Sequence, residues 1–213
     1  MTTALLGIAG AAALWFWLAF AGRTGTATAS AVKTTSTAAL ALAGLAAGAP
    51  GWVVAGLALG SAGDLALSRP GTRWFLAGMA AFALGHLAYV AGFAGGGLAP
   101  PGFAEVVAIA AVLALVLSTE VWLAPHTGAL RWPVRGYVLV IGAMALAATL
   151  LPPGQEQALM RWGAALFLAS DLVLALRLFR LQDPARQMLA ARVLWPLYWG
   201  GQALILSGAV AAG

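Results

Sequence analysis

The run Trp52-Val-Val-Ala-Gly-Leu-Ala-Leu-Gly-Ser-Ala-Gly-Asp64-Leu-Ala-Leu67 contains a single ionisable side chain, the carboxyl group of Asp64. A charge at bilayer depth costs about 3 kcal/mol on insertion scales, so such residues are rare in membrane helices and usually functional. A second apolar run has the same pattern, with Ser170-Asp171-Leu172 in its middle. The two isolated aspartates are therefore the first residues for which a role is sought.

The composition of the whole chain predicts a polytopic membrane protein. Of its 213 residues, 62% are hydrophobic and 8% are charged, whereas soluble domains carry roughly 25% charged residues. Because no long polar segment interrupts the apolar runs, we expect one membrane domain over residues 1–213. The net charge of +5 does not indicate nucleic-acid binding, because the basic residues stand singly or in pairs between apolar runs, where they signal topology.

The apolar runs predict an all-α bundle of eight transmembrane helices. Each run approaches the roughly 20 residues that span a bilayer, and turns such as Pro100-Pro101-Gly102 separate several of them. Ala19-Phe20-Ala21 resembles a signal-peptide cleavage site, but no Lys or Arg precedes the first run, so we expect it to be retained. The runs cover residues 3–21, 30–48, 51–68, 73–94, 103–124, 134–151, 157–179 and 188–211.

The basic residues predict the orientation of the bundle. Ten of the eleven flank the odd-numbered connections, and Arg161 alone lies at the opposite side. The positive-inside rule makes the basic side cytoplasmic and places the N- and C-termini outside, in our expectation at the inner (plasma) membrane of a bacterium. Asp64 and Asp171 then both lie in the cytoplasmic halves of their helices.

The helices that carry the aspartates also suggest an internal repeat. The runs over 51–68 and 157–179 have the same direction, and the run before each of them begins beside a basic residue. A parallel repeat of four plus four helices is one interpretation, and sites in membrane proteins often lie at repeat interfaces. The other interpretation is chance similarity, because the matching motif is short.

Two carboxyl groups in one low-dielectric cavity have a definite chemical use. Two like charges that share a site oppose each other, so one carboxyl can stay protonated and donate a proton while the other orients or deprotonates water. We therefore interpret Asp64 and Asp171 as a candidate catalytic acid/base pair. The structural alternative is that each aspartate caps a break in the backbone or pairs with an arginine such as Arg177.

Other polar side chains are expected near the depth of the aspartates. His86 and Tyr89 share one face of a predicted helix, where an interhelical hydrogen bond and a role at a site explain them equally well. The two histidines differ in depth and the chain has no cysteine, so we predict no metal and no cofactor. The candidate substrate-binding residues are Lys33, Ser61, His86, Tyr89, Tyr137, Ser170, Tyr198 and Gln202.

Six motifs, in this order and at these helix positions, resemble the YhhN family of integral membrane proteins. The chain departs from the family at Thr34, where a proline usually follows the lysine. The motifs are Lys33-Thr34-Thr35-Ser36, Gly63-Asp64, Phe82-Ala83-Leu84-Gly85-His86-Leu87-Ala88-Tyr89, Pro133-Val134-Arg135-Gly136-Tyr137, Phe167-Leu168-Ala169-Ser170-Asp171 and Tyr198-Trp199-Gly200-Gly201-Gln202-Ala203-Leu204-Ile205.

The resemblance implies an eight-helix fold and lysoplasmalogenase activity, in which the vinyl ether of a lysoplasmalogen is hydrolysed to a fatty aldehyde and a glycerophospho-alcohol. By similarity, Asp64 and Asp171 would supply the proton and steer the water, and Lys33 would face the phosphate of a lysophospholipid that enters from the bilayer. The alternatives are a transporter or binding protein that uses the aspartates as ion or ligand sites, and a lipid-binding scaffold. The sequence indicates no oligomeric state.

Overall fold

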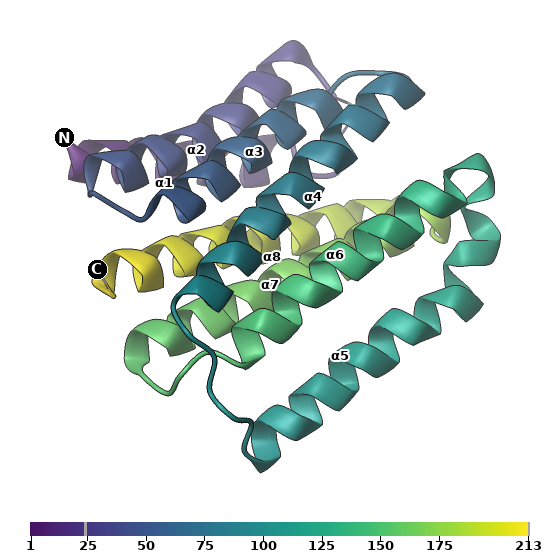
Figure 1. Cartoon of the computed structure of the whole chain (residues 1–213). Coiled ribbons are helices and arrows are strands. Elements are labelled where there is room, and N and C mark those ends of the chain that lie inside the picture. Colours follow the sequence, from purple (N-terminus) through teal and green to yellow (C-terminus); the bar gives the residue numbers. More distant parts are fainter. Residues whose placement is uncertain (24, 213) are drawn as a thin grey trace.

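The structure is a computed structural model that describes residues 1–23 and 25–212. In these ranges it contains eight α-helices, two short 3-10 turns and no strand, which confirms the predicted all-α fold. The helices run alternately up and down, so the two termini lie at the same end of the bundle (Figure 1). The elements are α1 (Thr2–Ala19), α2 (Ala27–Ala46), α3 (Gly51–Leu67), α4 (Thr72–Gly95), α5 (Phe103–Trp122), η1 (Ala124–His126), η2 (Gly128–Leu130), α6 (Arg131–Thr149), α7 (Gln155–Phe179) and α8 (Pro184–Ala211).

Helices α2 and α8 begin several residues before the predicted runs, because capping residues start them. Thr26 Oγ1 accepts a hydrogen bond from the backbone nitrogen of Ala29 at 3.0 Å, which caps α2. The side chain of Asp183 accepts one from the backbone nitrogen of Arg186 at 2.8 Å, and a proline follows it at the first position of α8. Hydropathy alone does not detect such polar first turns.

Five helical segments in the described ranges are long and apolar enough to cross a membrane, so the expectation of eight spanning helices is confirmed for these five. They are Thr2–Ala19, Thr72–Gly95, Phe103–His126, Gly128–Thr149 and Gln155–Phe179. Helix α3 is apolar but has only 17 residues. Threonines, serines and Lys33 lower the hydropathy of α2, and the arginines and glutamine of its first half lower that of α8.

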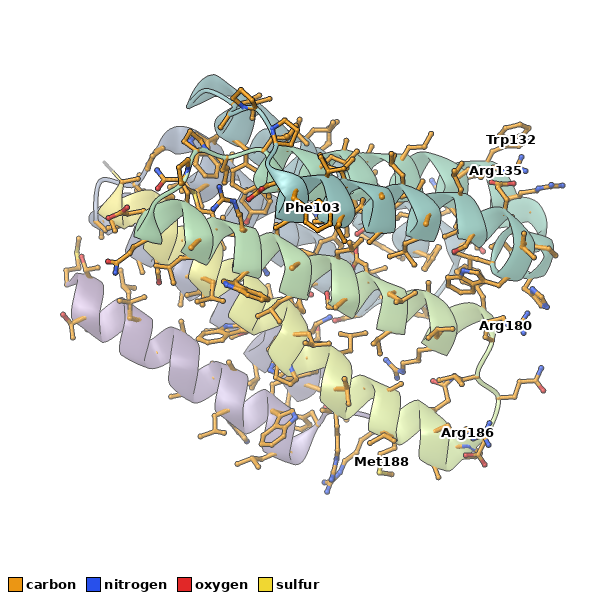
Figure 2. All side chains as sticks on the ribbon, turned by 90° about the horizontal axis from the view of Figure 1, so that it is seen from below. Phe103, Trp132, Arg135, Arg180, Arg186 and Met188 are labelled. Carbon is orange, nitrogen blue, oxygen red and sulfur yellow. The ribbon has the colours of Figure 1, made fainter. Side chains whose placement is uncertain are left out.

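All basic residues except Arg161 belong to the end of the bundle opposite to both termini. Figure 2 shows Arg135, from the start of α6, at this end together with Arg180 and Arg186, which flank the connection between α7 and α8. We call it the basic end. That it faces the cytoplasm, with the termini outside, stays a prediction from the positive-inside rule.

Helix α5 stands apart from the rest of the bundle (Figure 1). None of its residues is buried, and it packs mainly against α6 and the turn that follows it. Because its side chains are almost all apolar, the surface that α5 leaves open suits contact with lipid. The remaining helices form the packed part of the bundle, with α7 and α8 as the most extensively packed pair.

Glycines allow the backbones of α7 and α8 to approach closely. A Cβ atom added to Gly163 would lie 2.6 Å from the carbonyl oxygen of Gly201, and one added to Gly201 would lie 2.8 Å from that of Gly163. Small residues at such crossings are typical of membrane helices, where close packing replaces the hydrophobic effect as the main attraction. This contact fixes α7, and with it Asp171, against α8.

Gly201→Ala is expected to lower the melting temperature of the purified protein, because the new methyl group meets backbone atoms that cannot move aside. Overpacking of this kind costs about 1–3 kcal/mol. The matched control is Gly200→Ala, the neighbouring glycine, where an added Cβ has no atom within 4 Å. Thermal unfolding in detergent measures both variants, and equal melting temperatures would contradict the close contact.

The orientation is tested with single cysteines, since the natural chain has none. Gln182→Cys lies in the exposed connection at the basic end, and Leu98→Cys lies in a connection at the other end. In intact cells a membrane-impermeant maleimide is expected to label Leu98→Cys and to leave Gln182→Cys unlabelled until the cells are opened. The reverse pattern would invert the predicted topology.

Candidate active site

Asp64 lies in a buried polar cluster, here called the Asp64 cluster, which joins α2, α3 and α8. Its Oδ1 lies 2.8 Å from Lys33 Nζ. Its Oδ2 accepts hydrogen bonds from the hydroxyl groups of Tyr198, at 2.8 Å, and Thr37, at 3.1 Å. Asp64 is fully buried, and a charge at such a position requires a partner of opposite charge and further hydrogen bonds. Asp64 and Lys33, whose side chain retains 20% of its exposure, therefore form a partly buried ion pair.

The small residues of α3 make room for this cluster. A Cβ added to Gly60 would lie 2.9 Å from Gln202 Oε1 and 3.4 Å from the hydroxyl oxygen of Tyr198, so the glycine leaves room for these two side chains of α8. Ser61 donates a hydrogen bond to the carbonyl oxygen of Thr34 at 3.1 Å and ties α3 to α2. Gln202 is fully buried, and within the described ranges neither polar atom of its amide has a hydrogen-bond partner.

Asp171 belongs to a second cluster, the Asp171 cluster, formed by α4, α6 and α7. The hydroxyl group of Tyr137 donates a hydrogen bond of 2.6 Å to Asp171 Oδ2. His86 Nε2 lies 3.0 Å from that hydroxyl oxygen and 3.4 Å from the same carboxyl oxygen. His86 is buried, whereas the Asp171 side chain retains 12% of its exposure. This carboxyl group is thus held from one side and open on the other.

Aromatic rings separate the two clusters. The ring of Phe167 lies 5.3 Å from that of Tyr198 in the Asp64 cluster and 4.6 Å from that of His86 in the Asp171 cluster, measured between centroids. Phe82 adds a second ring, 5.7 Å from Tyr198. The two aspartates of the predicted acid/base pair are therefore members of different hydrogen-bonded groups.

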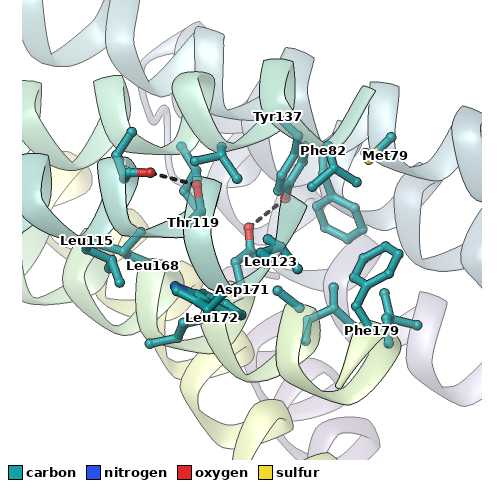
Figure 3. A pocket seen from close by; sticks show the side chains of 18 of the residues that line it. Met79, Phe82, Leu115, Thr119, Leu123, Tyr137, Leu168, Asp171, Leu172 and Phe179 are labelled. Atoms are coloured by element: carbon teal, nitrogen blue, oxygen red, sulfur yellow. Dashed lines mark hydrogen bonds between the residues drawn. The ribbon is translucent and has the colours of Figure 1, made fainter. Parts of the chain in front are cut away.

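The Asp171 cluster forms part of the wall of an apolar groove between α4, α5, α6 and α7 (Figure 3). The groove is narrow and open to the surface, with a cavity volume of about 90 Å³. Among the described residues that line it, Asp171 carries the carboxyl group and Tyr137 the phenol, and nearly all others are aliphatic or aromatic. Asp64 does not belong to this lining set. The arrangement offers one carboxyl group to an apolar ligand.

The groove depends on α5. Leu115, Val116, Thr119 and Trp122 form its wall on that side. Thr119 donates its hydroxyl hydrogen to the carbonyl oxygen of Val116 at 2.6 Å, so it presents little unsatisfied polarity to the groove. A second hollow lies at the opposite end of the bundle, around Trp52 and Gln157, and none of the predicted site residues lines it.

The other predicted site residues have local roles in the structure. Ser170 is buried and donates a hydrogen bond to the carbonyl oxygen of Phe167 at 2.7 Å. Tyr89 is buried against α3, where its ring occupies the space that a Cβ on Gly56 would need, and within the described ranges its hydroxyl group has no partner. Lys33, Ser61, Tyr198 and Gln202 surround Asp64, while His86 and Tyr137 meet at Asp171.

Sequence reasoning missed Thr37, although it contacts Asp64 directly. Its spacing from Lys33 was a usable signal, because residues four apart lie on one face of a helix. The rings of Phe82 and Phe167 that separate the two clusters, here called the aromatic layer, were missed as well. Neither residue has a polar group that marks it. No three His, Cys, Asp or Glu side chains come together as metal ligands in the described part of the chain.

Comparison with known proteins gives one match. The model of the YhhN family matches residues 28–209, a span that includes both clusters and the groove. No curated protein matches the chain, and no solved structure does.

The ion pair of the Asp64 cluster gives a stability prediction. Lys33→Met leaves an uncompensated buried carboxylate and is expected to destabilise the protein by about 3–5 kcal/mol, whereas Lys33→Met combined with Asp64→Leu restores most of the loss. The control is Arg135→Met, which removes the exposed ion pair with Glu120 and should change the melting temperature little. Thermal unfolding of the three variants in detergent measures this. A double variant no more stable than Lys33→Met would contradict the partly buried pair.

Proposed function

The chain belongs to the YhhN family, and we propose that this multi-pass membrane protein is a hydrolase of the lysoplasmalogenase type. It takes a lysophospholipid with a vinyl ether chain from the bilayer and releases a fatty aldehyde and a glycerophospho-alcohol. In a bacterium, this bilayer is the plasma membrane. One observation carries the proposal. A single carboxyl group, that of Asp171, faces an otherwise apolar groove in the wall of the bundle.

The groove suits a substrate with one hydrocarbon chain. Its walls are aliphatic and aromatic, so the chain of the lipid moves from one apolar environment to another when it enters. Helix α5 packs mainly on α6 and not on α7. The lipid therefore enters sideways between α5 and α7, without passing through water.

The reaction begins with a proton. Hydrolysis of a vinyl ether, R–CH=CH–O–R′, starts when an acid protonates the carbon remote from oxygen, which forms a C–H bond and leaves an oxocarbenium ion. Protonated Asp171 gives this proton through Oδ1, because its Oδ2 is hydrogen-bonded to Tyr137. The resulting carboxylate then lies beside the cation that it has created and stabilises it, as carboxylates do in glycosidases.

Water completes the reaction. Its oxygen bonds to the cationic carbon while its proton returns to the Asp171 carboxylate, which restores the acid and gives a hemiacetal. The hemiacetal breaks its bond to the glycerol oxygen, which leaves as the alcohol, and its hydroxyl proton is lost as the aldehyde forms. His86 and Tyr137, joined to each other and to Asp171, carry the proton to the departing oxygen.

This assignment separates the roles of the two aspartates. Asp171 is the catalytic residue, since it meets the reacting atoms in the groove. Asp64 is a positioning residue, because its ion pair with Lys33 and its bond to Tyr198 hold the aromatic layer behind His86. The sequence predicts that both aspartates are catalytic, as an acid/base pair, whereas in this proposal only Asp171 is catalytic and Asp64 supports activity through other contacts.

Asp171→Asn is expected to lower aldehyde release from a lysoplasmalogen by about 10³-fold, because the amide cannot act as the acid. Its melting temperature should stay close to that of the natural protein. The matched control is Asp183→Asn, which keeps a capping residue at the exposed start of α8. Mass spectrometry of the products in detergent measures the reaction. A fully active Asp171→Asn protein would exclude the assignment.

Asp64→Asn distinguishes positioning from direct catalysis. A positioning role predicts a lower melting temperature, with residual activity in the folded fraction and an unchanged dependence of rate on pH. If Asp64→Asn instead melted normally and were inactive, Asp64 would act at the reacting atoms with Asp171. The transporter alternative predicts lipid or ion flux in proteoliposomes with no new product, so the same mass spectra decide between the two functions.

A further inference from the structure

We infer that Arg180 and His126 form the binding site for the phosphate group of the lysophospholipid, where the groove reaches the basic end of the bundle. The inference rests on the proposed function for the identity of the lipid. It adds a site for the part of the substrate that does not react.

Arg180 connects the two walls of the groove. It follows Phe179, which lines the groove, and its backbone leaves the helical conformation with φ −125° at the end of α7. Its Nη1 donates a hydrogen bond of 3.2 Å to the carbonyl oxygen of Trp122, a lining residue at the end of α5. The guanidinium group therefore lies across the end of the groove between α7 and α5. Figure 2 shows Arg180 at this end.

A second basic side chain lies against this guanidinium group. Arg180 Nη1 is 3.0 Å from Nδ1 and 2.6 Å from Nε2 of His126, which stands in the turn after α5. Both side chains are exposed. This pair of adjacent side chains suits a negatively charged ligand with several oxygen atoms. The guanidinium group and the imidazole can each donate hydrogen bonds to such a ligand.

Within the described ranges, no carboxylate neutralises the charge of Arg180. The ion pairs of carboxylates in these ranges are with Lys33, His86 and Arg135. Arg135 Nε lies 2.8 Å from Glu120 Oε1, which neutralises the nearest glutamate of α5. Lys33, which the family resemblance implies would face the phosphate, is held by Asp64. Arg180 thus remains able to bind an external anion.

The spacing along α7 agrees with the length of the substrate. Arg180 follows Asp171 by nine residues, which corresponds to roughly 13–14 Å along a helix. In a lysoplasmalogen, seven bonds separate the carbon that accepts the proton from the phosphorus atom, a length of roughly 9 Å when extended. One polar contact of roughly 3 Å at each end extends this reach to about 15 Å. Along the axis of α7, a single lipid is therefore long enough to reach from one position to the other.

The test compares two ligands that the enzyme does not cleave. These are 1-O-hexadecyl-lysophosphocholine and 1-O-hexadecylglycerol, which share the alkyl chain and differ in the phosphate head group. Native mass spectrometry of the full chain, released from a maltoside detergent with both ligands in equal amounts, gives the preference for the phosphate-bearing lipid. The variants are Arg180→Gln and His126→Gln. The matched control is Arg186→Gln, another exposed arginine at the same end (Figure 2).

We expect Arg180→Gln to reduce the preference for the phosphate-bearing lipid about tenfold, as loss of one charge-assisted contact does, and His126→Gln to reduce it less. Arg186→Gln should keep the natural preference. An unchanged preference in Arg180→Gln, or no preference in the natural protein, would overturn the site. Equal binding of inorganic phosphate alone would show a free-anion site and overturn the assignment to a lipid in the groove.

The measured lipid preference tests the phosphate site separately from the hydrolase proposal. If no lysoplasmalogen releases an aldehyde while the preference still depends on Arg180, the hydrolase proposal fails and the phosphate site is supported. If aldehyde is released and Arg180→Gln keeps the preference, the phosphate site alone fails.

Discussion

The ion pair between Lys33 and Asp64 is the contact on which the packed part of the bundle depends. In an apolar interior a lone carboxylate or ammonium group is strongly disfavoured, so each group fixes the position of the other. Because Lys33 comes from α2, Asp64 from α3 and the bonded Tyr198 from α8, the pair connects the first half of the chain to the last helix. Gly60 of α3 suits this constraint, since a Cβ atom there would crowd the side chains of Gln202 and Tyr198 of α8.

The second aspartate has the opposite environment. Asp171 is held through one oxygen by Tyr137, with His86 close behind, and the groove leaves its other side open. The difference arises from what covers each helix. Asp64 is enclosed by packed helices, whereas α5 covers Asp171 at the far side of a groove and contributes no buried residue of its own. Two similar motifs therefore acquire different surroundings, and in our proposal different tasks.

Much of this architecture could be predicted from hydropathy. The apolar runs gave the number and order of the helices, and the spacing of Arg and Lys predicted that Arg135, Arg180 and Arg186 would share one end, as Figure 2 shows. Hydropathy predicts the depth of a residue in the membrane but not the direction in which its side chain points around the helix axis. Lys33 and Asp64 are separated by 31 positions, and no local pattern shows that they face each other. The groove was also not predicted, because its walls are mostly leucines, valines and phenylalanines, residue types that also meet lipid elsewhere.

The groove is open to two different media, the hydrocarbon of the bilayer and the water at the basic end, and this favours the forward direction of the proposed reaction. One side of it adjoins the lipid along α5, and its end lies among exposed arginines. A lysolipid is amphiphilic, but its two fragments are not: the aldehyde partitions into hydrocarbon and the glycerophospho-alcohol dissolves in water. The products therefore leave by different exits and are diluted into different phases. They rarely meet again at Asp171, so physical separation opposes both recombination and inhibition by product.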